Sequence, residues 1–154
     1  MQHLKDTFKH QGKRKILIAE LVEMGIKNKD ILEAFNAIPR HFFLDSAFDR
    51  IAYEDRAFPI AADQTISQPY TVAVQSSALG LPEGAKILEI GTGSGYQAAV
   101  LEELGYKVFT IERQKALFDF SKRLLSELGM RRITQKFGDG YKGLPAFAPF
   151  DGIL

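Results

Sequence analysis

A single segment, KILEIGTGSGYQ at residues 86–97, constrains the fold of this chain more than any other part of the sequence. A short apolar run leads into glycines at alternate positions, Gly91, Gly93 and Gly95, and a helical pattern follows them. Glycine lets the main chain adopt positive φ and lets a ligand approach the backbone without meeting a Cβ. The first N–H groups of the following helix lack partners within the helix and can donate to an anionic group. The segment therefore predicts a strand, a turn and a helix that together bind a ligand.

Two kinds of nucleotide-binding enzyme share such a turn. From Gly93 to Ala98 the sequence also fits the pattern G-x-G-x-x-A of dinucleotide enzymes, so an NAD-dependent oxidoreductase or another nucleotide-dependent enzyme stays open as an alternative. Glu89 lies inside the predicted strand, two residues before Gly91, and a carboxylate there favours a cationic ligand. A purely structural turn needs one glycine or two, so it is the weaker interpretation.

Acidic residues also follow the next two predicted strands. The strand at residues 107–111 ends in Glu112, which suits ribose hydroxyls but does not separate the two kinds of enzyme. The strand at residues 133–137 precedes Asp139, which can accept a hydrogen bond from an amino group such as adenine N6, although Asp-Gly turns are common. Strands alternate with helices along this part of the chain, and this predicts an α/β fold with a doubly wound, mostly parallel, Rossmann-like sheet.

The N-terminal third has a helical pattern. Apolar spacing predicts one helix over residues 13–24, ended by Gly25, and a second that Asn28 caps and Pro39 ends. The second helix carries few side chains that can bind bases, so a packing arm is favoured over a DNA-binding helix-turn-helix. Residues 40–59 mix aromatic and charged residues without a period, which indicates an irregular layer.

A polar loop, residues 64–69, leads into the core. Ser67 is a candidate cap for the helix predicted over residues 70–79, and Gly80 ends that helix. We expect residues 1–60 to form a helical arm and cover, and residues 61–154 to form the cofactor-binding core, within one structural domain.

Composition limits the classes of function. With 154 residues, of which 45% are hydrophobic and 25% charged, the chain can bury one core and shows no sign of disorder. The net charge of +1 argues against a protein that binds nucleic acid by neutralising phosphates. The basic cluster at Lys9, Lys13, Arg14 and Lys15 is most simply a solvated helix face.

Neither a metal nor a membrane is expected. The chain has no cysteine, and His3, His10 and His41 lack the spacing of a metal site. No segment approaches the roughly 20 apolar residues that span a bilayer, and the polar N-terminus lacks the apolar core of a secretion signal. We expect a cytoplasmic protein.

These motifs together resemble a known family. Glu89 to Gly95, Glu112 and Asp139-Gly140 are similar to the cofactor motifs of class I methyltransferases that use S-adenosylmethionine. QTISQPY at residues 64–70 and the run Pro39-Arg40-His41-Phe42-Phe43 narrow the resemblance to the protein-L-isoaspartate O-methyltransferase family. The resemblance extends from about Ile16 to Leu154.

The resemblance implies methyl transfer from S-adenosyl-L-methionine to the carboxylate of an L-isoaspartyl or D-aspartyl residue in a damaged protein, with S-adenosyl-L-homocysteine as product. The ester then collapses to a succinimide, and hydrolysis returns some normal aspartate. A carboxyl group with a pKa of about 3.9 is already ionised at neutral pH, so positioning rather than base catalysis should supply the rate.

The resemblance also implies the roles of individual residues. Ser67 orients the substrate carboxylate and is not a nucleophile, since its loop holds no histidine to activate it. The implied cofactor-binding residues are Glu89 and Gly91 at the methionine portion, Gly93 and Gly95 in the turn, Glu112 at the ribose, and Asp139 and Gly140 at the adenine. The implied substrate-side residues are Gln64, Thr65, Ile66 and Tyr70.

The sequence departs from the family pattern in two places. Family members often have glycines where this chain has Ala61-Ala62-Asp63, so the mobility of that loop can differ. Residues 150–154 have the pattern of a fourth strand, whereas the family fold continues through further strands and helices. We therefore expect a C-terminally short chain, dimer pairing or strand exchange through an exposed strand near Leu154, and, as a further alternative, an inactive cofactor-binding fragment.

Overall fold

The computed structural model describes residues 4–154 and contains a four-stranded parallel sheet. The strands lie in the order β5-β4-β3-β6. Their bounds are β3 (Lys86–Ile90), β4 (Lys107–Glu112), β5 (Ile133–Phe137) and β6 (Gly152–Ile153). All three pairings are parallel, which confirms the predicted parallel, Rossmann-like sheet.

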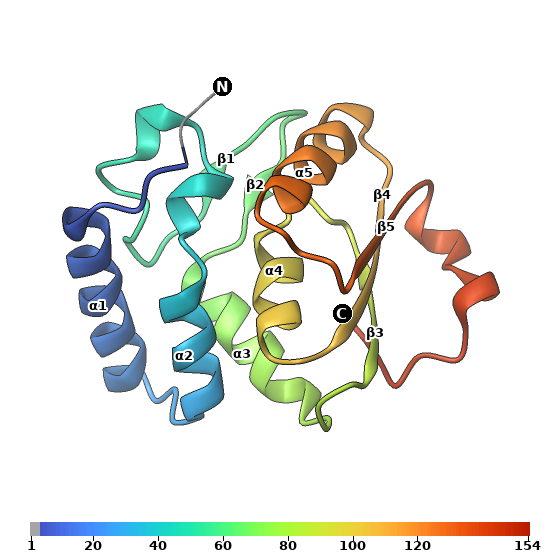
Figure 1. Ribbon diagram of the computed structural model, residues 1–154, viewed down its shortest axis with the longest axis horizontal. Coiled ribbons are helices and arrows are strands. Elements are labelled where there is room, and N and C mark those ends of the chain that lie inside the picture. The colour runs from blue at the N-terminus through green and yellow to red at the C-terminus, as the bar shows by residue number, and fades with distance from the viewer. Residues whose placement is uncertain (1–3) are drawn as a thin grey trace.

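Helices cover one face of this sheet. They are α3 (Pro69–Leu79), α4 (Tyr96–Glu103) and α5 (Lys115–Glu127), and they lie together on one side of the strands in Figure 1. The segment between β5 and β6 lies on the other side and contains the short 3₁₀ helices η3 (Gly140–Lys142) and η4 (Pro145–Phe147). Phe147 and Phe150 pack against Phe109 of β4, with ring centroids 5.0 and 5.5 Å apart.

The N-terminal layer is built from α1 (Phe8–Glu23), α2 (Lys29–Ala37) and the 3₁₀ helices η1 (Arg40–Phe43) and η2 (Ser46–Phe48). Helix α1 begins five residues before the predicted start, because the Thr7 hydroxyl accepts a hydrogen bond from the amide of His10 and caps a polar first turn. Asn28 caps α2 by accepting from the amides of Asp30 and Ile31, as predicted. Apolar spacing alone cannot detect a polar turn.

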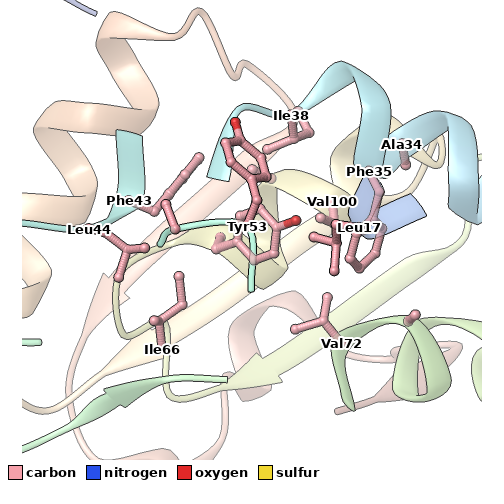
Figure 2. Close-up of a cluster of buried hydrophobic side chains, with 14 of the residues drawn as sticks. Leu17, Ala34, Phe35, Ile38, Phe43, Leu44, Tyr53, Ile66, Val72 and Val100 are labelled. Carbon is pink, nitrogen blue, oxygen red and sulfur yellow. The ribbon is translucent and has the colours of Figure 1, made fainter. Parts of the chain in front are cut away.

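This N-terminal layer shares its hydrophobic core with the sheet domain. Figure 2 shows side chains from both parts in one buried cluster, in which Leu17 and Phe35 of the N-terminal layer lie beside Val100 of α4; Val72 of α3 belongs to the same cluster. All four of these side chains are at most 1% exposed. Helix α2 therefore packs directly on α4, and burial of apolar area is what holds the layer in place. A boundary at residue 60 stays a prediction.

One member of the predicted basic face of α1 is in fact buried. Arg14 is only 6% exposed, and its Nη2 atom lies 2.8 Å from Oδ2 of Asp6. Its Nη1 atom donates to the Tyr53 hydroxyl at 3.2 Å. The prediction of a fully solvated face was wrong for Arg14, because a long-range partner can pull one member of a charge cluster into the core.

The polar loop before α3 is partly a hairpin. Strand β1 (Phe58–Pro59) pairs antiparallel with β2 (Thr65–Ile66). The turn between them holds Ala62 at φ 58° and Asp63 at φ 53°. This left-handed region favours glycine, which gives a physical reason for glycines at this turn.

Strand β6 forms one edge of the sheet and spans two residues rather than the predicted five. Hydrogen bonds continue past it, since the Leu154 amide donates to the Leu88 carbonyl and the Ile90 amide donates to the Leu154 carbonyl. None of the helices described in residues 4–154 combines the length and the hydropathy that crossing a bilayer requires.

Candidate active site

The carboxyl ends of three strands meet at one rim. In the register of the sheet Glu89 lies opposite Thr110, and Glu112 lies opposite Phe137. The amide of Gly91 donates to the Ile111 carbonyl at 2.9 Å, so the glycine turn is tied to the end of β4. The predicted cofactor residues, which are far apart in the sequence, thus reach the same edge.

A cavity of about 290 Å³ lies at this rim. Its walls are formed by the backbone of the glycine turn, by the predicted acids Glu112 and Asp139, and by part of the polar loop. The predicted residues that line it are Gln64, Thr65, Gly91, Gly93, Glu112, Asp139 and Gly140. Residues that the sequence did not single out complete it, namely Ile90, Ile111, Arg113, Gln114, Leu117 and Tyr141.

A smaller cavity of about 60 Å³ adjoins the first and shares Thr65, Gly91 and Gly93 with it. Ile66, Ser67 and Glu89 line this second cavity. The structure therefore brings Ser67 to the same glycine turn as Glu112 and Asp139, across one continuous wall. Of the predicted site residues, only Gly95 and Tyr70 line neither cavity.

The glycines differ in what they do. Gly91 has φ of +91°, and a Cβ added there would meet nothing within 4 Å, so the bare main chain faces open space. A Cβ on Gly140 would lie 2.4 Å from Cγ2 of Ile90, and one on Gly95 would lie 3.2 Å from Cδ1 of Leu125. Gly91 leaves room for a ligand, whereas Gly95 permits packing of the turn against α5.

Glu112 is buried and holds the glycine turn. Its Oε2 atom accepts from the amide of Gly93 at 2.9 Å, and its Oε1 atom accepts from the amide of Gln114 at 2.8 Å. A carboxylate has about four acceptor positions, so lone pairs remain for the hydroxyls of a ribose. The residue predicted for the ribose is thereby pre-oriented before any ligand binds.

Glu89 is buried beside two threonines. Its Oε2 atom accepts from the Thr110 hydroxyl at 2.5 Å, and the Thr92 and Thr110 hydroxyl oxygens lie 2.7 Å apart. Burial raises the pKa of Glu89 to about 8; the Thr110 hydrogen bond opposes that rise, and the negative charge of Glu112 adds to it. A cation placed beside Glu89 would favour its ionised form.

Gln97 is a site residue that pattern reasoning missed. It lines the smaller cavity, and its Nε2 atom donates to the Ser76 hydroxyl at 2.8 Å. Its Oε1 atom is buried and has no hydrogen-bond partner within residues 4–154. A buried acceptor without a partner is rare, so Gln97 offers a place for a donor of a ligand. Its position in the first turn of the helix after the glycines was the available signal.

The turn at Ser67 is held by the N-terminal layer. The N-cap of α3 is Gln68, whose side chain makes no capping bond, so the prediction that Ser67 caps this helix was wrong. Asp55 supplies the cap from a distance, since Oδ1 accepts from the Tyr70 amide and Oδ2 accepts from Nε2 of Gln68, both at 2.7 Å. Ser67 therefore does not use its hydroxyl as this cap, and the residue lines the smaller cavity.

Replacing Asp55 by alanine is expected to destabilise the protein by about 1 kcal/mol, as loss of a helix cap does. The first-turn amide of Tyr70 would lose its acceptor. Chemical denaturation of Asp55→Ala and of Glu127→Ala, which removes an exposed acid of α5, measures the difference. Equal midpoints for Asp55→Ala and the parent would contradict the capping role.

Two histidines that are far apart in the sequence meet in the N-terminal layer. Ligand-type atoms of Asp6, His10 and His41 lie within 4.8 Å of one another, which spacing along the chain did not predict. The ring centroids of the histidines are 3.8 Å apart, and the ring nitrogens contact Asp49, Thr7 and Tyr53. Arg14 pairs with Asp6. The cluster therefore joins α1 to η1, through the stacked rings of His10 and His41 and through the Tyr53 hydroxyl, which contacts both Arg14 and His41. The third histidine, His3, lies outside the described residues.

A larger cavity of about 580 Å³ lies at the other end of the sheet. Its walls include Glu83 before β3, Gly105 before β4 and Arg132 before β5. Ligands of open α/β sheets bind at the carboxyl ends of the strands, so the smaller pair of cavities is the candidate site despite its size.

Comparison with known proteins agrees with this geometry. Residues 12–154 match the family described as protein-L-isoaspartate(D-aspartate) O-methyltransferase. The chain belongs to this family. The match covers all the predicted site residues.

The relatives support the assignment. Proteins named protein-L-isoaspartate O-methyltransferase from Christiangramia forsetii and Flavobacterium psychrophilum are 56% and 58% identical over 151 residues, which cover 98% of this chain and 71% of each relative. A solved structure of that name has a TM-score of 0.83 at 34% identity, covering 92% of this chain and 47% of that one.

A second solved structure has a TM-score of 0.77 at 23% identity and covers 91% of this chain and 71% of that one. It is described as a putative enzyme of this kind from Plasmodium falciparum in complex with S-adenosyl-L-homocysteine, and at this identity it supports the fold.

Membership confirms the predicted fold class and the predicted reaction, which is methyl transfer to the carboxylate of isoaspartyl residues in proteins. It favours methyl transfer over the oxidoreductase alternative. Dimer pairing and strand exchange find no support in these comparisons, and the cytoplasmic location stays a prediction.

Proposed function

We propose that the two adjoining cavities of this chain bind S-adenosylmethionine and present its methyl group to an isoaspartyl carboxylate near Ser67. The observation that carries this proposal is that polar residues from separate parts of the sequence meet at the two cavities. Ser67, Glu89, Glu112 and Asp139 come from four separate segments and line one continuous wall around the glycine turn. Packing of the fold does not require polar side chains of this kind to share a cavity.

The chemistry of the walls fits the cofactor in parts. In the larger cavity Glu112 would bind the ribose hydroxyls, and Asp139 with the bare backbone at Gly140 would bind the adenine. In the smaller cavity Glu89 would bind the ammonium of the methionine portion. Gly91 and Gly93 line both cavities and would let the cofactor cross between them against main chain.

The protein's part in the reaction is positioning. The bound cofactor supplies a methyl group on a positively charged sulfonium. The substrate carboxylate, with a pKa of about 3.9, is ionised at neutral pH and needs no base. No histidine or lysine lines either cavity within residues 4–154, which agrees with a site that orients an anion rather than one that removes its proton.

Ser67 would orient that anion. Ser67 is exposed and lines the smaller cavity, and its hydroxyl can donate one hydrogen bond to a carboxylate oxygen. We expect Ser67→Ala to lower kcat about 10- to 50-fold with a smaller change in KM, because the lost bond serves orientation. Methyl transfer to an isoaspartyl peptide measures this, with the exposed Ser126→Ala as the control variant. An unchanged kcat for Ser67→Ala would remove Ser67 from the reaction.

A methyl-transfer assay tests the proposed function as a whole. The parent chain should methylate a peptide that contains L-isoaspartate and should leave the same peptide with normal aspartate unmodified. Turnover excludes an inactive cofactor-binding fragment. Binding of S-adenosylhomocysteine without turnover on the isoaspartyl peptide would support the fragment instead.

A further inference from the structure

Arg40 is a charged residue whose burial the reaction described so far does not explain. It begins η1, and its side chain is 0% exposed. Its Nη2 atom donates to the main-chain carbonyl of Ser67 at 2.8 Å and lies 3.4 Å from the carbonyl of Arg56. Its Nε and Nη1 atoms are buried and have no hydrogen-bond partner among residues 4–154.

Stability alone does not account for this residue. A buried charge with unpaired donors is expensive, and apolar replacements of similar volume are often neutral or stabilising. No carboxylate lies within ion-pair distance of Arg40 among the ion pairs of the described residues. The guanidinium therefore needs a different explanation.

The guanidinium joins two walls of the smaller cavity. On one side it holds the carbonyl of Ser67, and on the other it lies over the ring of Tyr96, 4.8 Å from the ring centroid. Ser67 and Tyr96 both line that cavity. Phe35 and Phe43 pack edge-on against the Tyr96 ring at 6.0 and 5.4 Å, so the ring is a fixed platform at the start of α4.

Asp55 holds the same turn from its other end. It accepts from Nε2 of Gln68 and from the Tyr70 amide, both at 2.7 Å, so the residues after Ser67 are fixed as well. Only a planar guanidinium can donate in its plane while stacking on an aromatic face, which a lysine cannot do. Arg40 thus links the main chain of Ser67 to the Tyr96 ring at the start of α4.

We propose that Arg40 is a positioning residue that fixes the Ser67 turn against Tyr96 and so aligns the Ser67 hydroxyl with the substrate carboxylate. This inference rests on the proposed function, because it gives Ser67 the role of orienting the substrate. It assigns a positioning role to a fully buried residue of the N-terminal layer.

A double-mutant cycle tests the coupling between the two residues. We expect Arg40→Leu to lower kcat about tenfold when Ser67 is present and less than about twofold in the Ser67→Ala background. The second effect is small because the Ser67 hydroxyl, which Arg40 would position, is already absent there. Affinity for S-adenosylhomocysteine should change less than about threefold, since Glu89, Glu112 and Asp139 are untouched. Equal losses of kcat in both backgrounds would show a merely structural role and overturn the proposal.

A conservative variant and a matched control complete the test. Arg40→Lys keeps a donor for the Ser67 carbonyl but loses the stacked plane, so its kcat should lie between those of the parent and Arg40→Leu. Arg56→Leu removes an exposed arginine from the same layer and should leave kcat unchanged. If Arg40→Leu fails to fold, the cycle is run with Arg40→Lys, and equal losses in both backgrounds again count against the proposal.

Hydrogen exchange supplies a readout that does not depend on turnover. Amides within residues 64–72 should exchange about tenfold faster in Arg40→Leu, whereas those of β3 and β4 should keep their protection. Should the parent neither bind S-adenosylhomocysteine nor turn over, the proposed function fails, and the exchange experiment still decides whether Arg40 fixes the turn. Unchanged exchange in residues 64–72 would overturn the inference alone.

Discussion

Affinity for S-adenosylhomocysteine is expected to rise by up to about 50-fold between pH 6 and pH 8, because its ammonium pairs with the ionised form of Glu89. Burial raises the pKa of this carboxyl group to about 8, so most molecules hold it protonated at pH 6. Each ligand that binds at pH 6 must therefore displace a proton. At pH 8 about half of the molecules already carry the charge, and the proton is displaced from fewer of them.

Calorimetric titration at pH 6, 7 and 8 measures this dependence. Repeating the titration at one pH in buffers of different ionisation enthalpy counts the protons released, and we expect close to one per ligand at pH 6. Glu89→Gln should bind more weakly at pH 8 and show almost no dependence on pH over this range. A parent protein with the same affinity at all three pH values would show that Glu89 does not bind the ammonium.

The same pKa has a consequence for stability. The folded pKa of Glu89, about 8, exceeds the ordinary value of 4.5, so the folded state binds more protons than the unfolded state between these values. The free energy of unfolding should therefore fall as pH rises from about 4.5 to about 8. Glu89→Gln removes this contribution, and its melting temperature should exceed that of the parent most clearly near pH 8.

Removal of the Glu112 carboxylate is expected to have the largest effect on cofactor binding. We expect Glu112→Ala to weaken binding of S-adenosylhomocysteine at least about 100-fold, because hydrogen bonds to a charged group contribute about 1.5–3 kcal/mol each. The variant loses the acceptor for ribose hydroxyls and also the acceptor for the amides of Gly93 and Gln114. The glycine turn would then be free to move in the absence of ligand.

Two further variants separate these contributions. Glu112→Gln keeps the shape but has only one acceptor oxygen, so its affinity should lie between those of the parent and Glu112→Ala. Glu127→Ala, an exposed acid of α5, serves as the control and should bind normally. Circular dichroism checks that each variant is folded. Normal affinity in a folded Glu112→Ala would contradict the ribose assignment.

The convergence of the proposed cofactor residues was predictable because its signal is local. Strand, glycine turn and helix follow one another directly in the sequence, and parallel pairing brings Glu112 and Asp139 to the same rim without further information. The error at Ser67 has the opposite cause. Its turn is capped by Asp55, which comes from an irregular segment with no periodic pattern, so local reasoning assigned the cap to the nearest hydroxyl.

Contacts between distant segments account for the other differences. Arg14 is buried because Tyr53 supplies a partner that only the folded chain brings near, and the contact between Arg40 and the Ser67 carbonyl also joins segments far apart in the sequence. The meeting of His10 with His41 depends in the same way on packing of η1 against α1. Charge and spacing along the chain carry no information about such pairs.

The most direct test of the proposed cofactor site is a calorimetric titration of this 154-residue chain with S-adenosylhomocysteine and, separately, with NAD. We predict saturable binding of one S-adenosylhomocysteine per chain, lost in Glu112→Ala, and no heat of binding with NAD. Binding of NAD, or a Glu112→Ala variant that binds S-adenosylhomocysteine like the parent, would contradict this prediction.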